Sequence, residues 1–395
     1  MNNENNNNTI ALIVFFRKFI SVFFSVFLNI YVLSIVNNVG LVIKYNLVGI
    51  IFGFIFNTLI LKFINNKTAK IIYNSSFIEL IICIILLLTL KENVYKYIYL
   101  FRILYALEQV SYAAPYEMII MGSNNKKTMS NFLANVNILS SLATILTPVF
   151  SGFIIESFSY NMLFVILGIE ALIIIIISTR LKDFYIADKK LDLKGFYHKI
   201  KKYPHIKDIY KCMFFRRISS QGVITDLLPV ILFLRLNSEL SVGAYNTLFA
   251  ILSIFALSLL KIVNKKNKSK KFYVPISILI FIASVILVYY PSFITLMLYY
   301  IFMNTLGTVI ESESCSIVYA SIDNKELKEY NREHDIFFNI YMLIGQVISY
   351  SVAYILYTYF YNVNILSIIV SISMFFLIVS SYYLQKTEKY LESAK

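Results

Sequence analysis

Residues 160–179 read YNMLFVILGIEALIIIIIST, a run in which Glu170 is the only charged side chain. A helix needs about 20 apolar residues to cross the hydrocarbon core of a bilayer, so this stretch predicts a membrane-spanning helix. A helix also satisfies its own backbone groups where no water is present. Similar runs recur, and we place twelve spans at 11–36, 40–61, 71–90, 94–121, 130–155, 160–179, 217–236, 240–262, 272–290, 292–320, 336–360 and 363–383.

The composition supports the same class of fold. Of 395 residues, 58% are hydrophobic and 15% are charged, and the mean hydropathy is +0.71. A soluble domain has about 45–50% apolar and about 25% charged residues. This excess excludes a water-soluble enzyme and a disordered chain, and the alternating pattern of a membrane barrel is absent from the sequence. We therefore expect an all-α membrane protein with 12 transmembrane helices in two six-helix bundles.

The basic residues gather in alternate connections between the spans. The net charge is +14, and most Lys and Arg residues fall in the second, fourth, sixth, eighth and tenth connections and the carboxyl-terminal tail. Cytoplasmic loops of membrane proteins collect Lys and Arg, so the charge indicates orientation and not a nucleic-acid partner. The bias predicts a multi-pass protein of the plasma membrane with both termini in the cytoplasm.

A weak internal repeat divides the chain into halves. LKFINNK at 61–67 matches LKIVNKK at 260–266, and each follows the second span of its half. We therefore expect two bundles in parallel orientation. The predicted segments are an Asn-rich disordered tail at 1–10, an N-terminal bundle at 11–180, a basic cytoplasmic linker at 181–216, a C-terminal bundle at 217–384 and a cytoplasmic tail at 385–395.

Several short motifs accompany this architecture. They are basic Lys62, Lys67 and Lys70 after the second span, Arg102 in the fourth, Thr147-Pro148 and Ser151-Gly152 in the fifth, and Arg332-Glu333 leading to Gly345-Gln346. Together with the twelve spans they resemble the major facilitator superfamily of secondary transporters. The sequence departs from the family pattern in lacking the acidic residue of the basic loop and in replacing two glycines of the span-five antiporter motif. The resemblance implies alternating access, with conformational roles for Lys62, Lys67, Lys70, Pro148, Gly152, Arg332 and Glu333.

Span four is the richest in polar side chains. A charge at mid-membrane is costly and requires an explanation. Arg102, Tyr105, Gln109 and Tyr112 recur every three or four residues and share one face, which predicts a face toward a cavity. Glu108 lies about 120° around the helix from Arg102 and can instead meet a neighbouring span. Arg102 serves either as a fixed cation for a carboxylate or anionic substrate, or as a structural tie between helices.

Other acids in the spans are also candidates. Asp226 precedes Pro229, which can kink the seventh span, and a carboxylate there either exchanges a proton or only fixes packing. Glu311 and Glu313 are two residues apart and point to nearly opposite sides of a helix, so they do not form a paired acid site. Glu170 is a secondary candidate in the sixth span.

The sequence predicts a transporter without a cofactor. The three cysteines and three histidines have no metal-ligand spacing, and no phosphate-binding glycine loop appears. We expect proton-coupled efflux of a small organic solute, with a proton or sodium gradient as energy source, and a monomer. One alternative is a transport-inactive relative that serves as a membrane receptor, scaffold or immunity partner. A membrane-embedded transferase would need a catalytic constellation that the sequence lacks.

Overall fold

The computed structural model describes residues 6–121, 126–182, 191–219, 223–264, 272–322, 327, 330–360 and 364–393. Within these ranges the regular structure is entirely helical. The chain forms two compact units. Unit 1 comprises Met1–Lys190 and Leu232–Thr247, and unit 2 comprises Leu191–Ile231 and Leu248–Lys395.

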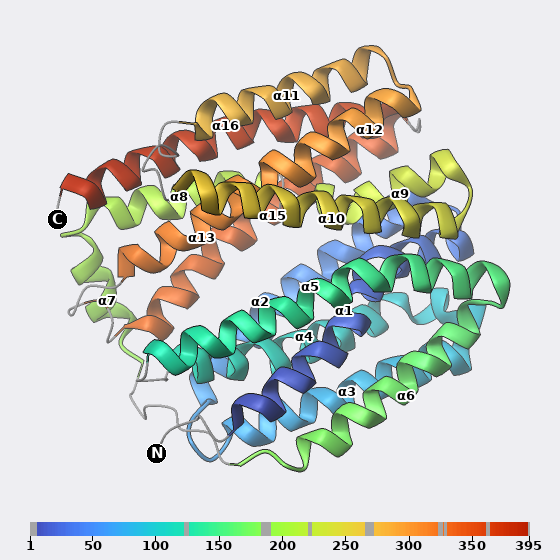
Figure 1. The fold of residues 1–395 in the computed structure, drawn as a ribbon, viewed down its shortest axis with the longest axis horizontal. Coiled ribbons are helices and arrows are strands. Elements are labelled where there is room, and N and C mark those ends of the chain that lie inside the picture. The colour runs from blue at the N-terminus through green and yellow to red at the C-terminus, as the bar shows by residue number, and fades with distance from the viewer. Residues whose placement is uncertain are drawn as a thin grey trace. The chain divides into compact units, whose positions relative to one another are not determined.

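Unit 1 contains the first six long helices. They are α1 (Asn7–Val36), α2 (Val39–Phe63), α3 (Ala69–Leu90), α4 (Ile98–Met121), α5 (Lys126–Ser157) and α6 (Tyr160–Ser178), with the short 3-10 helix η2 (Lys91–Tyr97) between α3 and α4. Helix α4 packs against both α2 and α3, while α1 packs against α5 and α6 (Figure 1). The first part of α10 (Glu239–Asn264) also belongs to this unit.

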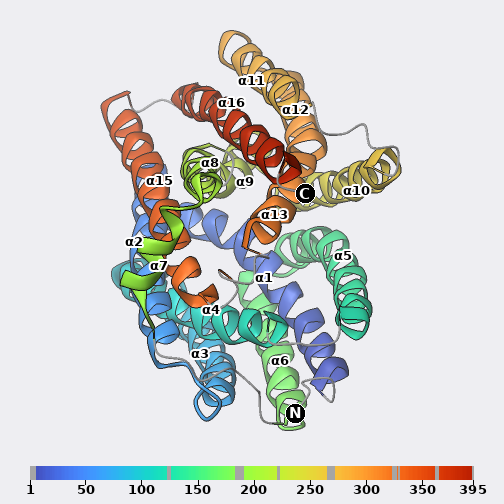
Figure 2. The same cartoon turned by 90° about the vertical axis from the view of Figure 1, so that its left-hand side faces the viewer.

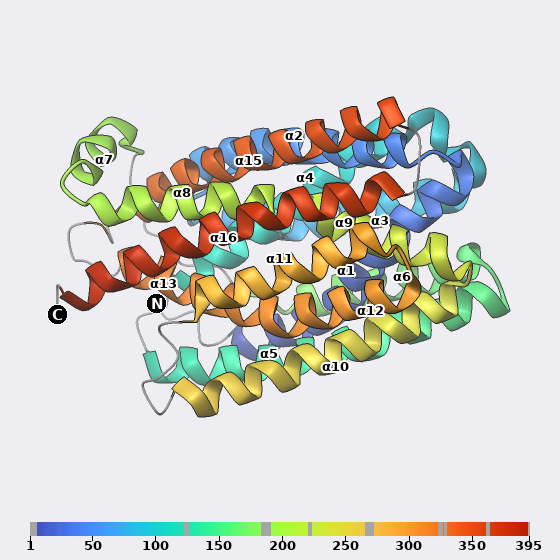
Figure 3. The same cartoon turned by 90° about the horizontal axis from the view of Figure 1, so that it is seen from above.

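Unit 2 contains the remaining helices. They are α7 (Leu193–Ile200), α8 (Pro204–Ile218), most of α9 (Val223–Leu236), the second part of α10, α11 (Tyr273–Tyr289), α12 (Phe293–Phe302), α13 (Thr308–Ile322), α15 (Asn331–Phe360) and α16 (Asn364–Ser393). A π-helical turn, Met303–Gly307, joins α12 to α13. Helix α16 packs against α8 and α11 (Figure 2), and α8 also packs against α15 (Figure 3).

The long helices account for all twelve predicted spans. Ten stretches of the described chain are long and apolar enough to cross a membrane, and one of them, Ala69–Met118, contains both α3 and α4. The shorter apolar helix α11 supplies the remaining crossing. On α6, Ile169, Leu172 and Ile176 are more than half exposed on one face, as expected for a helix that borders lipid. The predicted all-α membrane class is confirmed.

Similar tight turns follow the first long helix and α9. Helix α1 ends at Val36 and is followed by Asn37, whose φ of 50° is left-handed, and the side chain of Asn38 caps α2. In the second half, Asn237 follows α9 with φ 52°, and Ser238 caps α10 by accepting from the backbone N–H of Ser241 at 3.1 Å. Asparagine tolerates this left-handed backbone better than most residues. Each half therefore joins its first two spans by the same kind of tight turn.

The seventh span begins earlier than the sequence indicates. Helix α8 starts at Pro204, inside the range predicted as a linker, and the apolar stretch runs from Pro204 to Leu236. Its basic residues lower the hydropathy, but Arg216 and Tyr210 are buried. The first part of α10 likewise groups with unit 1, although its sequence lies in the predicted second bundle. Hydropathy does not report on such packing partners.

Candidate functional site

A buried ion pair joins α1 to α4 in unit 1. The Nη2 atom of Arg17 donates a hydrogen bond to Oε1 of Glu108, and the two residues are 5% and 0% exposed. Removing either charge from water is costly, and a close partner of opposite charge offsets that cost. Glu108 therefore contacts a neighbouring helix, α1, instead of Arg102 on its own helix. Its partner is Arg17, which the sequence analysis did not single out.

Aromatic rings surround this pair. The guanidinium of Arg17 lies 4.9 Å from the ring centroid of Tyr112, and Tyr112 stacks with Tyr73 of α3 at 5.4 Å and with Tyr116 at 5.8 Å. The face of an aromatic ring carries partial negative charge and attracts a cation. The cation is thus stabilised by one carboxylate and by a tyrosine stack that spans α3 and α4.

The pair leaves hydrogen-bonding capacity unused. Nε and Nη1 of Arg17 and Oε2 of Glu108 are buried, and none has a hydrogen-bond partner among the described residues. Buried polar atoms are nearly always paired, so unpaired ones call for a specific reason. A proton, a water molecule or a polar substrate group would satisfy these atoms.

Arg102 occupies a separate position between α2 and α4. Its guanidinium lies over the rings of Tyr45 and Tyr105, at 5.4 and 5.3 Å from their centroids, and donates to Oε1 of Gln109 at 3.4 Å. A Cβ atom on Gly49 would lie only 2.2 Å from Nε of Arg102. Gly49 therefore makes room for the guanidinium. Arg102 therefore contacts Tyr105 and Gln109 of its own helix, whereas Glu108 pairs with Arg17.

Glu170 stands apart from the pair. Its Oε2 atom is buried in α6, and no partner for it occurs in the described part of the chain. No hydrogen bond or ion pair within the described ranges joins it to Arg17 or Glu108. It stays a candidate on its own.

In unit 2, Asp226 accepts a hydrogen bond from the hydroxyl of Tyr350 on α15. Asp226 lies in the first turn of α9, and Pro229 is buried one turn later in the same helix. Ser349 contacts the end of α8 and the start of α9: its hydroxyl donates to the carbonyl of Ile218 at 3.1 Å and accepts from the N–H of Val223 at 3.5 Å. Side chains of α15 therefore satisfy polar groups of both helices.

Arg216 is a second buried arginine that the sequence analysis did not select. It is 1% exposed in α8, and it donates to the hydroxyl of Ser314 and, at 3.3 Å, to the carbonyl of Ile310, both in α13. The neighbouring acids of α13 have different surroundings. Glu313 accepts from Tyr273 at 3.4 Å, whereas Glu311 interacts electrostatically with Arg217. The two carboxylates thus have different described partners.

The motif residues of the fifth span lie in a close helix contact. A Cβ on Gly152 would lie 2.5 Å from the carbonyl oxygen of Glu239 in α10, and one on Gly243 would lie 2.2 Å from that of Pro148. The backbones of α5 and α10 can approach this closely only because both positions are glycine. Pro148 is buried inside α5. This contact lies within unit 1.

The remaining motif residues lie near helix ends. Lys62 is exposed in the last turn of α2, Lys67 is exposed in the turn that follows, and Lys70 is half-buried at the start of α3. Arg332 is half-buried in the first turn of α15, and Glu333 beside it is buried and accepts from the N–H of Asp192 at 2.8 Å. That bond ties the segment before α7 to α15.

A weak signal for both missed arginines is present in the sequence. Arg17 lies about 9 Å inside the span predicted to begin at residue 11, since a helix rises about 1.5 Å per residue, and apolar residues precede and follow it. Arg216 precedes the apolar run of α9 by a few residues and reads as part of a basic loop. Only the start of α8 at Pro204 shows that it lies within a span.

Comparisons with known proteins agree with this architecture. Residues 9–324 match the family model of the Major Facilitator Superfamily. A bacterial homologue of the human lysosomal transporter Spinster, in an inward-facing and unoccupied conformation, has a similar structure, with a TM-score of 0.65 and 12% identity over 98% of this chain and 96% of that one. Its inward-facing and occupied form gives a TM-score of 0.61 and 12% identity over 99% and 95%. No curated protein matches the chain in sequence.

The family match covers most of the chain, and the helices form the expected spans. The fold is that of a membrane transporter. The chain belongs to the Major Facilitator Superfamily.

Proposed function

We propose that this transporter exports a small organic solute in exchange for protons, and that Glu108 carries the proton. The buried Arg17–Glu108 pair carries the proposal. The Glu108 carboxylate is 0% exposed, and one of its oxygens has no hydrogen-bond partner. A proton bound there would neutralise a buried charge. Asp226, which accepts from Tyr350 in unit 2, is the second candidate carrier.

Protonation of Glu108 changes the charge of its surroundings. Neutral Glu108 no longer compensates the charge of Arg17. The guanidinium then still lies over the Tyr112 ring but has no counter-ion. A protein with two conformations shifts toward the one in which the unpaired guanidinium of Arg17 has more favourable partners. In this scheme protonation biases which side of the plasma membrane the pathway opens to, and the two bundles alternate between these states.

The tyrosines of α3 and α4 support an organic solute with a planar group. Tyr73, Tyr112 and Tyr116 form a stacked column, and stacked rings can also take a flat ligand group at the end of the column. We propose that a drug-like or peptide-like solute is moved outward by a monomer with both termini in the cytoplasm.

The test is transport into proteoliposomes with an imposed pH gradient. Ethidium and a fluorescently labelled tripeptide serve as probes, and a pH-sensitive dye inside the vesicles reports proton movement. We expect gradient-driven flux of at least one probe and its loss in Glu108→Gln, because the amide cannot exchange a proton. Asp208→Asn is the control, since this carboxylate pairs with the exposed Lys386 at 3.0 Å.

Two results would overturn the proposal. One is probe flux that ignores the pH gradient, and the other is coupled flux that persists unchanged in both Glu108→Gln and Asp226→Asn. If neither probe moves and the protein co-purifies with a stable stoichiometric partner, the receptor or scaffold alternative replaces transport.

A further inference from the structure

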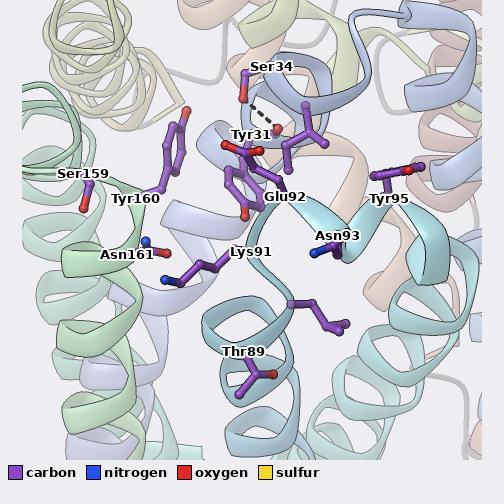
Figure 4. Close-up of a pocket in the computed structure, with 12 residues that line it drawn as sticks. Tyr31, Ser34, Thr89, Lys91, Glu92, Asn93, Tyr95, Ser159, Tyr160 and Asn161 are labelled. Carbon is purple, nitrogen blue, oxygen red and sulfur yellow. Dashed lines mark hydrogen bonds between the residues drawn. The ribbon is translucent and has the colours of Figure 1, made fainter.

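Unit 1 has a polar cavity whose lining does not include Arg17 or Glu108. It has a volume of about 730 Å³ and lies where α1 and α3 end and α6 begins. Its lining includes Tyr31, Lys91, Glu92, Asn93, Tyr160 and Asn161 (Figure 4). The charge bias of the loops predicts that this end of the unit faces outside.

Two opposite charges stand at adjacent positions of this lining. Lys91 and Glu92 are both exposed, and neither side chain makes a hydrogen bond or ion pair with any described residue. Lysine is depleted in loops on the outer side of membrane proteins, and the other two connections at this end, 37–38 and 158–159, carry no charge. An exposed cation beside an exposed anion is therefore unusual here.

The backbone at Lys91 is strained. Its φ is 46° and its ψ is −126°, a region that a lysine rarely adopts and that costs about 1–3 kcal/mol. Asn37 and Asn237, the other described non-glycine residues with positive φ, have the short polar side chain that tolerates it. The surrounding structure thus holds Lys91 in place, and its side chain extends toward Asn161 (Figure 4).

The walls supply groups of a different kind. The rings of Tyr31 and Tyr160 lie 4.8 Å apart at an angle of 45° and stand together on one side of the cavity (Figure 4). The side-chain amides of Asn93 and Asn161 have no hydrogen-bond partner among the described residues. A cation, an anion, two amides and an aromatic wall therefore face one space.

We propose that this cavity is a binding site for a small zwitterion that carries a planar group. The acidic group of the ligand meets Lys91 and Asn161, its ammonium meets Glu92, and its planar part packs against Tyr31 and Tyr160. A free aromatic amino acid has all of this chemistry, whereas the ammonium and phosphate of a zwitterionic lipid headgroup share its two charges and lack the planar group. The site does not depend on the proposed proton coupling.

The experiment measures binding to the full chain in nanodiscs made only of phosphatidylglycerol. Three matched probes are used: tyrosine with both charges, tyramine with the ammonium alone, and 4-hydroxyphenylpropionate with the acid alone. We expect tyrosine to bind about tenfold more tightly than either single-charge probe, since each lost partner removes a charge-assisted hydrogen bond. A parallel arm titrates phosphorylethanolamine, and another repeats the tyrosine titration in phosphatidylethanolamine nanodiscs.

Point variants test whether Lys91 and Glu92 form the binding site. Lys91→Ala and Glu92→Gln are each expected to weaken zwitterion binding about three- to tenfold, because partly exposed charge contacts are worth less than buried ones. Lys96→Ala is the matched control: it removes an exposed lysine of the same short helix that packs on Tyr95 at 5.8 Å and does not line the cavity. Asp208→Asn should bind tyrosine as the unchanged chain does, because Asp208 pairs with the exposed Lys386 and does not line the cavity. The binding assay uses no pH gradient, so its result is separate from a failure of proton coupling.

The outcomes decide between the sources of the ligand. Tyrosine binding that phosphatidylethanolamine nanodiscs suppress, or preferential binding of phosphorylethanolamine, assigns the site to a lipid headgroup. Tyrosine binding of equal strength in both lipids assigns it to a free solute. Equal affinity for all three aromatic probes, or binding that Lys91→Ala and Glu92→Gln leave unchanged, overturns the proposal.

Discussion

The two units each bury an arginine among their helices, but they satisfy it differently. Arg17 in unit 1 bonds to the carboxylate of Glu108, whereas Arg216 in unit 2 bonds to the hydroxyl of Ser314 and the carbonyl of Ile310. A carboxylate can take up a proton and lose its charge, whereas a hydroxyl and a carbonyl cannot at ordinary pH. The contrast indicates a switchable contact in unit 1 and a fixed one in unit 2.

Breaking the Arg17–Glu108 pair should have the largest effect on stability. Arg17→Ala leaves the Glu108 carboxylate buried without its counter-ion, and breaking a buried pair in this way costs about 3–5 kcal/mol. We expect a large fall in the melting temperature of the detergent-solubilised protein, followed by intrinsic tyrosine fluorescence.

The matched control removes both charges together. Arg17→Met combined with Glu108→Leu should recover most of the lost stability, because apolar residues of similar volume can replace a buried pair. An equal loss in the single and double variants would show that the charges themselves are not the cause.

Arg216→Ala should destabilise the protein less than Arg17→Ala. It removes hydrogen bonds from a charged donor, worth about 1.5–3 kcal/mol, and leaves only neutral acceptors behind. The melting temperature of Arg216→Ala should fall by the same amount from pH 5 to pH 8, because Ser314 and Ile310 supply no titrating group. A loss as large as that of Arg17→Ala would contradict the proposed difference between the units.

The glycines at the helix contacts extend the comparison. In unit 2, a Cβ on Gly345 would lie 2.4 Å from the backbone oxygen of Phe214, so Gly345→Ala must push α15 away from α8. Overpacking of this kind costs about 1–3 kcal/mol. The melting temperature measures the loss, and an unchanged value would mean that the two helices can separate freely at this point.

Gly49→Ala in unit 1 should have the smallest effect on stability. Its new methyl group would meet the guanidinium of Arg102, a side-chain end that can shift, and not a backbone atom, so we expect a loss at the lower end of the range for overpacking, about 1 kcal/mol. Gly53→Ala on the same helix is the control, since nothing lies within 4 Å of its Cβ position. A fall in melting temperature for Gly49→Ala as large as for Gly345→Ala would show that Arg102 is held rigidly.

The sequence predicts the fold far better than it predicts the site. Apolar runs such as 160–179 identify spans because length and hydropathy alone decide whether a helix can cross a bilayer. The same reasoning places the start of the seventh span too late, since Arg216 and its basic neighbours reduce the hydropathy of α8. It selects Glu108 from its cost in lipid but cannot name Arg17, which lies 91 residues away in the chain.

The amino-acid sequence by itself determined the helical class, the twelve crossings and the acids that need a partner in the membrane. These follow from local properties, namely the transfer energy of side chains and the hydrogen bonds within a helix. Only the tertiary structure decided which partner each buried charge has, why Gly49 and Gly345 have no side chain, and that Lys91 and Glu92 face a cavity. Those outcomes depend on helices that meet in space, and no local pattern encodes such contacts.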